Sequence, residues 1–259
     1  MNYLVIVRHG LTEWTGRFTG WTDIDLAPSG VEMTKKYAIR IKEKGIDFDL
    51  AYSSLLKRAY KTIEIVLATI DQTNIPIIKD WHLNERHYGA LQTLSKPEMV
   101  KKYGEEQVNL WRRSYDVAPP KVDEKDPRHP INDPLYKDVP RKLLPAGESL
   151  KDTYNRVVPY FKNEIEKKLA EGKNILLSSH HNALRAMIKY LDNLDDVSVV
   201  SLNIPYCIPL IYEYENGKKV NKYYLASDEE VESIITSIKN QTSLSLRQKP
   251  SKSDKIIRQ

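Results

Sequence analysis

The sequence predicts an α/β fold in which a mostly parallel central sheet is flanked by helices on both sides, a three-layer sandwich. Short apolar runs rich in β-branched residues alternate along the chain with longer segments whose apolar residues recur at helical spacing. Two of these runs, 3–7 and 174–178, are followed at once by polar residues that include a histidine, as expected at the carboxyl ends of parallel strands. With 259 residues, of which 41% are hydrophobic, the chain can bury a large core.

Capping and turn signals set the boundaries of most elements. Proline at a helix start and glycine just past its end bound a helix at Pro28 and Gly45. Ser149 with Asp152 opens a long helix, and Asn216-Gly217 between two alternating runs is a strong hairpin signal. We expect strands at 3–7, 50–53, 76–78, 174–178, 209–215 and 219–225, an irregular segment at 81–94, and helices at 28–44, 59–70, 95–103, 105–113, 149–169 with a kink at Pro159, 184–191 and after a Ser227–Glu230 capping box.

We expect a single domain over residues 1–241. Within it, residues 116–146 hold seven of the fourteen prolines and predict an irregular insertion, and long insertions of this kind often act as lids that exclude water from a site. Residues 242–259 carry five Lys/Arg and one acidic residue without a periodic apolar face. They predict a disordered basic tail.

Composition narrows the class of protein. The formal charge of +5 allows an anionic partner, but no Lys/Arg cluster is interleaved with aromatic residues, so phosphorylated metabolites are favoured over nucleic acid. A single cysteine, Cys207, excludes an intrachain disulfide framework and a Cys-rich zinc site. No stretch approaches the ~18 apolar residues of a membrane span, and no leader pattern opens the chain. We therefore expect a cytoplasmic protein with no membrane partner.

Two histidines at strand ends predict the chemistry. His9 follows the first strand and His180 follows the strand at 174–178, and parallel strands bring their carboxyl ends to one edge of the sheet. A neutral imidazole can attack phosphorus, and a second imidazole, if protonated, can stabilise the oxygens of the transferring group. Arg8 and Arg58 supply cationic donors at the same edge. Phosphoryl transfer needs mainly positioning and charge neutralisation, which this set provides.

The chain from residue 1 to about 241 resembles the cofactor-dependent phosphoglycerate mutases of the histidine phosphatase superfamily. The Arg8-His9-Gly10 motif marks only the superfamily, whereas Leu83 to Leu91 with the paired Arg112-Arg113 is specific to the branch of mutases and bisphosphoglycerate mutases. The other matching stretches are Arg17-Phe18-Thr19-Gly20-Trp21, Ser54 to Ala59 and Leu202-Asn203-Ile204-Pro205.

The resemblance implies a role for each matching residue. His9 would become phosphorylated, while Arg8, Arg58 and His180 would hold the transferring phosphoryl group. Glu85 would donate and accept the proton, as a carboxylate can do in general acid–base catalysis. The remaining matches are substrate contacts: Arg112, Arg113, Tyr88 and Lys96 for the carboxylate and second phosphate, Thr19 and Gly20 in the loop that faces the substrate, and Asn182 near the phosphoryl oxygens.

Three features depart from the family pattern: the residues after Arg8-His9-Gly10, the length of the loop to Arg17, and the residue after His180. Thr12 keeps the hydroxyl of the usual serine, but Thr15 lacks the amide that normally donates to the phosphoryl group, and the loop to Arg17 is shorter than usual. Loss of one preorganised donor can lower a rate by about 10²–10³. His181 replaces the usual glycine beside His180. It could obstruct the substrate sterically or replace the missing amide as a donor, and the sequence favours neither.

By this resemblance we expect interconversion of 3-phosphoglycerate and 2-phosphoglycerate through a phosphohistidine at His9. The reaction would be primed by 2,3-bisphosphoglycerate without a metal, in a homo-oligomer, dimer or tetramer. Alternatives are a bisphosphoglycerate mutase, a phosphatase whose phosphohistidine is open to water, and a weakened relative retained for binding because of Thr15 and His181. The hydroxyl at Thr12 and the Phe18-Thr19-Gly20-Trp21 stretch resemble the glycolytic mutase more than the bisphosphoglycerate mutase branch.

Overall fold

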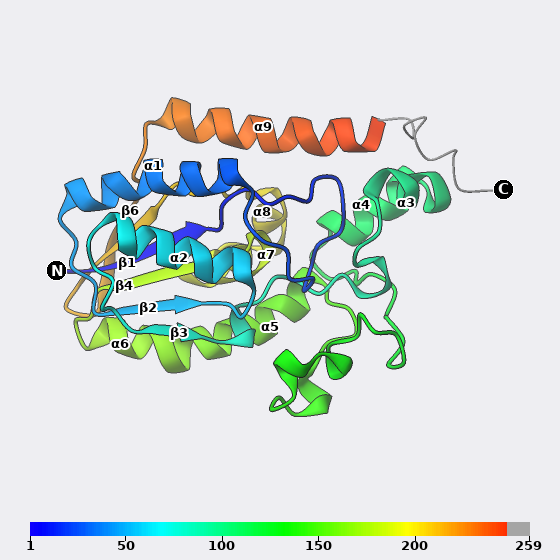
Figure 1. Cartoon of the computed structure of the whole chain (residues 1–259), viewed down its shortest axis with the longest axis horizontal. Helices are drawn as coiled ribbons and strands as arrows, with labels where there is room; N and C mark the ends of the chain where they lie inside the picture. Colours follow the sequence, from blue (N-terminus) through cyan, green and yellow to red (C-terminus); the bar gives the residue numbers. More distant parts are fainter. Residues whose placement is uncertain (248–259) are drawn as a thin grey trace.

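A six-stranded mixed sheet forms the centre of the molecule (Figure 1). The computed structural model describes the backbone of residues 1–247 and the side chains of residues 1–238. The strand order is β3-β2-β4-β1-β5-β6; the first four strands are parallel, β5 runs antiparallel to them, and β6 is antiparallel to β5 and so runs in the direction of the first four. The predicted fold class is confirmed. The strands are β1 (Asn2–Arg8), β2 (Leu50–Ser53), β3 (Ile77–Lys79), β4 (Ile175–Ser179), β5 (Leu210–Glu215) and β6 (Lys218–Tyr224).

Alternating side chains of the central strands build one core on each face of the sheet. Val5 and Val7 of β1 pack with helices α1 (Pro28–Lys44) and α2 (Lys57–Thr69). Leu4 and Ile6 pack with α5 (Leu150–Tyr160) and α7 (His181–Leu191) on the opposite face. Because all four strand residues are at most 1% exposed, β1 lies at the centre of the molecule, and the loop that follows it starts from a rigid base.

Strand register brings the two predicted histidines together. In the parallel ladder Arg8 pairs with Ser179, so His9 and His180 each follow directly after the last pair. The His9 N–H donates to the Ser179 carbonyl at 3.1 Å, which extends the ladder by one bond. Gly10 then passes so close to α1 that a Cβ there would lie 2.7 Å from the Gly30 carbonyl oxygen. This close approach explains why glycine follows the histidine.

Most predicted boundaries are confirmed. The Ser149–Asp152 capping box is present, with Ser149 Oγ accepting from the Asp152 N–H at 3.1 Å and the Asp152 carboxylate accepting from the Ser149 N–H at 2.9 Å. Pro159 removes one helical hydrogen bond, and the turns widen just after it into a π-helical stretch before α6 resumes. The remaining helical elements are Phe161–Glu166, α6 (Lys167–Ala170), α3 (Lys96–Tyr103), α4 (Glu105–Arg113), α8 (Asp196–Ser201), which was not predicted, and α9 (Asp228–Arg247).

The predicted insertion, 116–146, contains only three short 3₁₀ turns among its residues: Pro130–Asn132, Pro134–Tyr136 and Arg141–Leu143. It packs against the 81–94 loop, where the Ala90 N–H donates to the Pro120 carbonyl, and its Tyr136 ring lies tilted against the Trp21 ring, with the ring centroids 4.8 Å apart. Its role as a lid stays a prediction. The helix α9 runs beyond the predicted domain end at 241 to Arg247, and the rest of the predicted disordered tail lies outside the described residues.

Candidate active site

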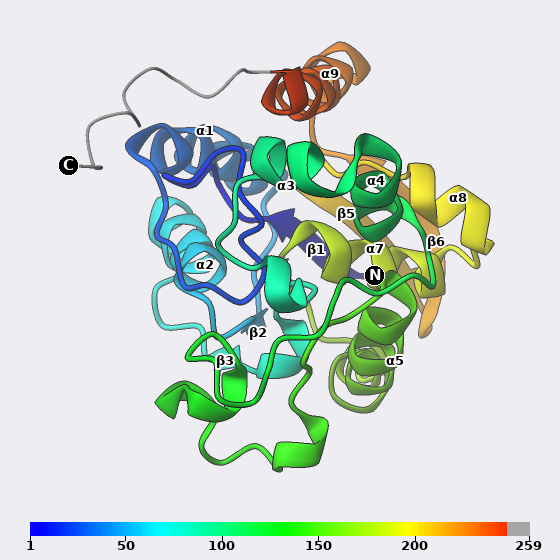
Figure 2. The same cartoon turned by 90° about the vertical axis from the view of Figure 1, so that its right-hand side faces the viewer.

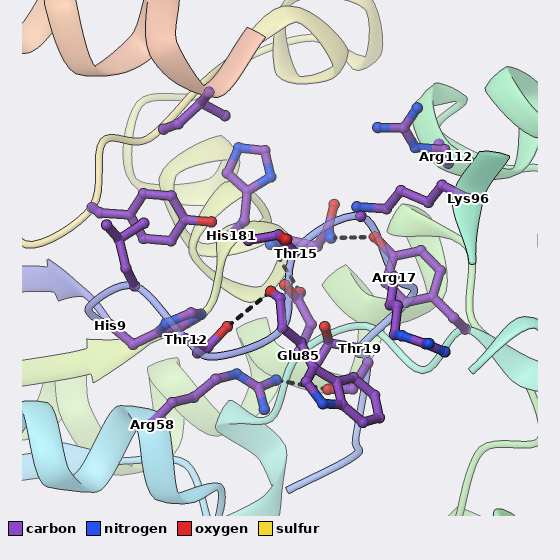
Figure 3. Close-up of a pocket in the computed structure, with 18 of the residues that line it drawn as sticks. His9, Thr12, Thr15, Arg17, Thr19, Arg58, Glu85, Lys96, Arg112 and His181 are labelled. Atoms are coloured by element: carbon purple, nitrogen blue, oxygen red, sulfur yellow. Dashed lines mark hydrogen bonds between the residues drawn. The ribbon is translucent and has the colours of Figure 1, made fainter. Parts of the chain in front are cut away.

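A cavity of about 680 Å³ opens at the carboxyl ends of the parallel strands, the edge that faces the viewer in Figure 2. Loop 9–27, loop 81–94, α3, α4 and the start of α7 surround it. In Figure 3, His9 and Arg58 lie on one side of the cavity and Lys96 and Arg112 on the other. The predicted site residues that line it are Arg8, His9, Thr12, Thr15, Thr19, Gly20, Arg58, Glu85, Tyr88, Lys96, Arg112, Arg113, His181 and Asn182.

His9 has the form of a neutral nucleophile. Its Nδ1 lies 2.7 Å from the Gly10 carbonyl oxygen, which can only accept, so Nδ1 carries the proton and Nε2 keeps its lone pair. Burial, followed by the charges of Arg58 and Arg8, holds the pKa of His9 well below its usual value. The side chain is therefore uncharged at neutral pH and free to attack an electrophile.

His180 lies deeper in the protein than His9: it is fully buried and is not among the residues that line the cavity. The two ring centroids are 5.0 Å apart. Arg58 Nε donates to His180 Nδ1 at 3.1 Å, so His180 Nε2 carries the proton and donates to Ser54 Oγ at 2.7 Å. Burial and the charge of Arg58 hold the pKa of His180 well below its usual value. In the free protein the second imidazole is thus neutral, and a bound phosphoryl dianion would favour its protonation.

The arginines nearest His9 are fixed by backbone carbonyls. Arg8 Nη1 donates to the Ile204 carbonyl at 2.7 Å, and its guanidinium stacks 3.6 Å above the Tyr206 ring. Arg58 donates to the carbonyls of Gly20 at 2.7 Å and Thr22 at 2.9 Å, and burial lowers its pKa to about 10. Carbonyl oxygens orient these cations without neutralising them. Their charge is therefore available to an anion in the cavity.

Glu85 is the only acidic residue among the described residues that line the cavity. Its Oε1 accepts hydrogen bonds from the N–H groups of Arg86 at 2.8 Å and Asn182 at 3.0 Å. Its other oxygen, Oε2, has no hydrogen-bond partner among the described residues. A carboxylate held on one oxygen and free on the other is suited to exchange a proton with a bound ligand.

The far side of the cavity carries a second group of cations. Lys96 opens α3, and Arg112 and Arg113 close α4. Burial, then the charges of Arg112 and Arg113, lower the pKa of Lys96 to about 7. Seven cationic side chains line the described part of the cavity against the one carboxylate of Glu85, and they are Arg8, Arg17, Arg58, Lys96, Arg112, Arg113 and Arg185. This charge distribution suits a small ligand with more than one negative group.

The three departures from the family pattern all lie at this cavity. Thr12 Oγ1 donates to the Trp14 carbonyl at 3.3 Å, and Thr15 is exposed. The Nε2 atom of His181 is buried and has no hydrogen-bond partner among the described residues. Burial and the charges of Arg8 and Arg185 hold the pKa of His181 well below its usual value. With His181 in place, the cavity is still of the size usual for ligand pockets.

Sequence reasoning did not single out two side chains that line the cavity and contact predicted site residues. Arg185, one turn along α7 from Asn182, donates to the Asn182 side-chain oxygen at 3.2 Å and lines the cavity. Helical spacing from His181 could have identified it. Tyr206, which stacks on Arg8, lies in a segment without regular structure, and only the tertiary fold brings it to His9.

The described residues contain no group of three or more His, Cys, Asp or Glu side chains arranged to hold a metal ion. None of the helices in residues 1–247 is long and apolar enough to cross a membrane.

Comparison with known proteins places the chain in a family. The profile of the histidine phosphatase superfamily (branch 1) matches residues 4–225. The 2,3-bisphosphoglycerate-dependent phosphoglycerate mutase of Borreliella burgdorferi (strain ZS7) is 47% identical over 247 residues, which cover 94% of this chain and 100% of the relative. The enzyme of the same name from Treponema denticola is 47% identical over 241 residues, covering 92% and 98%.

Solved structures with low sequence identity share the fold. A phosphoglycerate mutase from Bacillus anthracis str. Sterne superimposes with a TM-score of 0.63 at 21% identity, covering 92% of this chain and 96% of that one. A mycobacterial glucosyl-3-phosphoglycerate phosphatase gives a TM-score of 0.63 at 19% identity, covering 86% and 96%. At this level of identity the likeness concerns the fold alone.

The buried histidines predict a loss of stability in mild acid. His9 and His180 stay neutral in the folded protein because their pKa values lie below the usual 6.5, whereas they take up protons when unfolded. Stability is therefore fully present above about pH 6.5 and falls as the pH drops, by up to about 1.4 kcal/mol per pH unit for each histidine. Urea unfolding between pH 7.5 and 5.5 measures this slope. His9→Gln should make the slope shallower, and an unchanged slope would contradict the assignment.

Proposed function

The chain belongs to the 2,3-bisphosphoglycerate-dependent phosphoglycerate mutases, within branch 1 of the histidine phosphatase superfamily, and we propose that His9 carries the phosphoryl group in its reaction. The enzyme interconverts 3-phosphoglycerate and 2-phosphoglycerate. One observation supports the proposal most strongly: a neutral imidazole with a free Nε2 faces a cavity with seven cationic side chains and one carboxylate among its described residues.

The charge distribution fits the dependence on a bisphosphate. When bound, 2,3-bisphosphoglycerate supplies the phosphoryl group that primes His9. Arg8 and Arg58 would hold the phosphate to be transferred, and Lys96, Arg112 and Arg113 would hold the opposite end of the molecule. Lys96, with a pKa of about 7, would become fully protonated when an anion binds next to it.

Each transfer then forms one bond to phosphorus and breaks another. The Nε2 lone pair of His9 bonds to phosphorus while the bond from phosphorus to the donor oxygen breaks, and Glu85 delivers a proton to that oxygen. In the return step a hydroxyl oxygen of phosphoglycerate attacks the phosphohistidine, Glu85 takes the hydroxyl proton, and His9 leaves as the neutral imidazole. With 3-phosphoglycerate the 2-hydroxyl would accept the phosphoryl group to give the bisphosphate, and His9 would then take the 3-phosphate, so that 2-phosphoglycerate leaves and the phosphohistidine is restored. The cations nearest His9 stabilise the charge on the phosphoryl oxygens in both steps.

We also propose the remaining substrate contacts, the cellular location and the partners of the enzyme. Tyr88, Thr19, Gly20 and Asn182 would contact the substrate, and the reaction would need no metal.

We propose a cytoplasmic enzyme that acts on small phosphorylated acids, without nucleic-acid or membrane partners. A dimer or tetramer is expected from the resemblance alone. The relatives described above are both named as mutases, so the mutase reaction takes precedence over bisphosphate synthesis, phosphatase activity and a binding role.

His9→Ala is expected to abolish the transfer of labelled phosphate from 2,3-bisphosphoglycerate to the protein, because the cavity then lacks the neutral imidazole that lies within the field of both Arg58 and Arg8. Gel autoradiography after an alkaline quench measures the label, and its stability in alkali with loss in acid identifies phosphohistidine. His82→Ala is the matched control, since His82 lies outside the cavity and should leave labelling intact. Full labelling of the His9→Ala protein would refute the proposed nucleophile.

We propose that His181 replaces the donor missing at Thr15, because its Nε2 is unpartnered and Arg8 and Arg113 lie close enough to lower its pKa. His181→Gly should then lower kcat in an enolase-coupled assay by about tenfold to a hundredfold, as removal of one preorganised donor does. Adding Thr15→Asn to that variant should restore part of the rate. A faster His181→Gly enzyme would instead mean that the imidazole obstructs the substrate.

A further inference from the structure

The loop that carries Glu85 has little regular structure of its own. Only the short turn Trp81–Leu83 precedes Glu85, and the backbone then continues to a second short turn at Gly89–Leu91. Several carbonyl oxygens of this segment have no partner in a helix or a strand. A carboxylate that transfers protons must nevertheless be held within a fraction of an ångström of its working position. Other parts of the chain therefore have to fix this loop.

Arg156 of α5 binds the loop from behind. Its Nη1 donates to the carbonyl oxygens of His82 at 2.8 Å and Asn84 at 3.1 Å, and also reaches the Trp81 carbonyl at 3.3 Å. Its Nη2 donates to the carbonyl of Glu85 itself at 3.1 Å. The Glu85 carbonyl accepts a second bond, from Trp21 Nε1 at 2.5 Å. One guanidinium thus binds four of the five backbone carbonyls from Trp81 to Glu85.

Glu148 orients this arginine and secures the far side of the loop. It forms a bidentate ion pair with Arg156, in which Nε donates to Oε1 at 2.7 Å and Nη2 donates to Oε2 at 2.8 Å. Both side chains are buried, with 6% of Arg156 and 4% of Glu148 exposed. Glu148 Oε2 also accepts from the His87 N–H at 2.8 Å, and the Glu148 N–H donates to the His87 carbonyl at 2.8 Å. The pair therefore fixes the backbone on both sides of Glu85.

Neither member of the pair lines the cavity. What they control is the backbone from which the Glu85 side chain starts, and the carboxylate is then fixed at Oε1 by two backbone N–H groups. We infer that Arg156, oriented by Glu148, is a positioning residue that aims the free Oε2 of Glu85 at the substrate. This inference rests on the proposed role of Glu85 in proton transfer.

Arg156→Lys tests the inference. Lysine keeps a cation beside Glu148, but it lacks the planar fork that reaches both the carboxylate and the loop carbonyls. We expect kcat in the enolase-coupled assay to fall by about tenfold to a hundredfold, as a small misplacement of a catalytic group does, with the Kd for 3-phosphoglycerate unchanged. Thermal melting confirms that the variant is folded. If it is not, Glu148→Gln, which keeps an oxygen acceptor for both partners, takes its place.

A double-mutant cycle separates positioning from general structural support. If Arg156 acts through Glu85, adding Arg156→Lys to Glu85→Gln should not lower kcat further, because the group it positions is already inactive. An equal loss in both backgrounds, or a wild-type kcat for Arg156→Lys, would overturn the inference. Wild-type kcat for Glu85→Gln alone would instead overturn the proposed role of Glu85, so the two failures are distinguishable.

Arg128 offers a matched control from the same region. It is also paired with a carboxylate, that of Asp126 at 2.7 Å, and its Nη1 donates to the carbonyls of Ala90 at 3.1 Å and Gln92 at 2.8 Å. These carbonyls belong to the same loop but lie beyond Glu85. Arg128→Lys should therefore leave kcat within about twofold of the wild-type value, and a loss as large as that of Arg156→Lys would contradict a specific effect on Glu85.

Discussion

Uncompensated positive charge around His9 is the constraint on which the rest of the site depends. Cations in a buried cavity are costly to desolvate, which lowers the pKa of both Arg58 and Lys96, and the charges of Arg112 and Arg113 lower that of Lys96 further. The chain satisfies these groups with neutral acceptors: Arg8 donates to Ile204, Arg58 to Gly20 and Thr22, and Arg185 to Val199, in each case to the backbone carbonyl. Carbonyls hold the side chains in place without cancelling their charge, so full compensation comes only when a multiply charged phosphate ester binds. Burial, together with the charges of Arg58 and Arg8, lowers the pKa of His9 and keeps its imidazole neutral.

The fold supplies this arrangement through a few strand ends and helix starts. The parallel pairing of β1 with β4 sets His9 beside His180, and the close approach of α1 at Gly10 determines the direction of the loop that leaves His9. The start of α7 provides the Asn182 N–H that fixes Glu85, and the same helix carries Arg185 one turn later. The insertion at 116–146 and the Arg156–Glu148 pair support the Glu85 loop from the side away from the cavity. Catalytic groups from four distant segments are thus attached to one rigid sheet.

Sequence reasoning succeeded where the determinants are local. The helix from Pro28 to Gly45, the hairpin at Asn216-Gly217 and the capping box at Ser149 depend on residues near one another in the chain, and all three are confirmed. The resemblance to the phosphoglycerate mutases also identified most of the residues around the cavity. It could not show that His180 lies behind His9 or that Tyr206 stacks on Arg8, because those contacts depend on how separate elements pack. The Arg156–Glu148 pair could not be predicted for the same reason, because Arg156 binds backbone carbonyls, which are present at every residue and give no sequence pattern.

The central claim is that His9 passes its phosphoryl group to phosphoglycerate and not to water. The most direct measurement loads the enzyme with labelled phosphate from 2,3-bisphosphoglycerate, removes the excess donor, and follows the label after 3-phosphoglycerate is added. The account predicts that the acceptor greatly accelerates loss of label from His9 and that the label appears in phosphoglycerate and bisphosphoglycerate. Release of labelled inorganic phosphate at the same rate with and without the acceptor would contradict it.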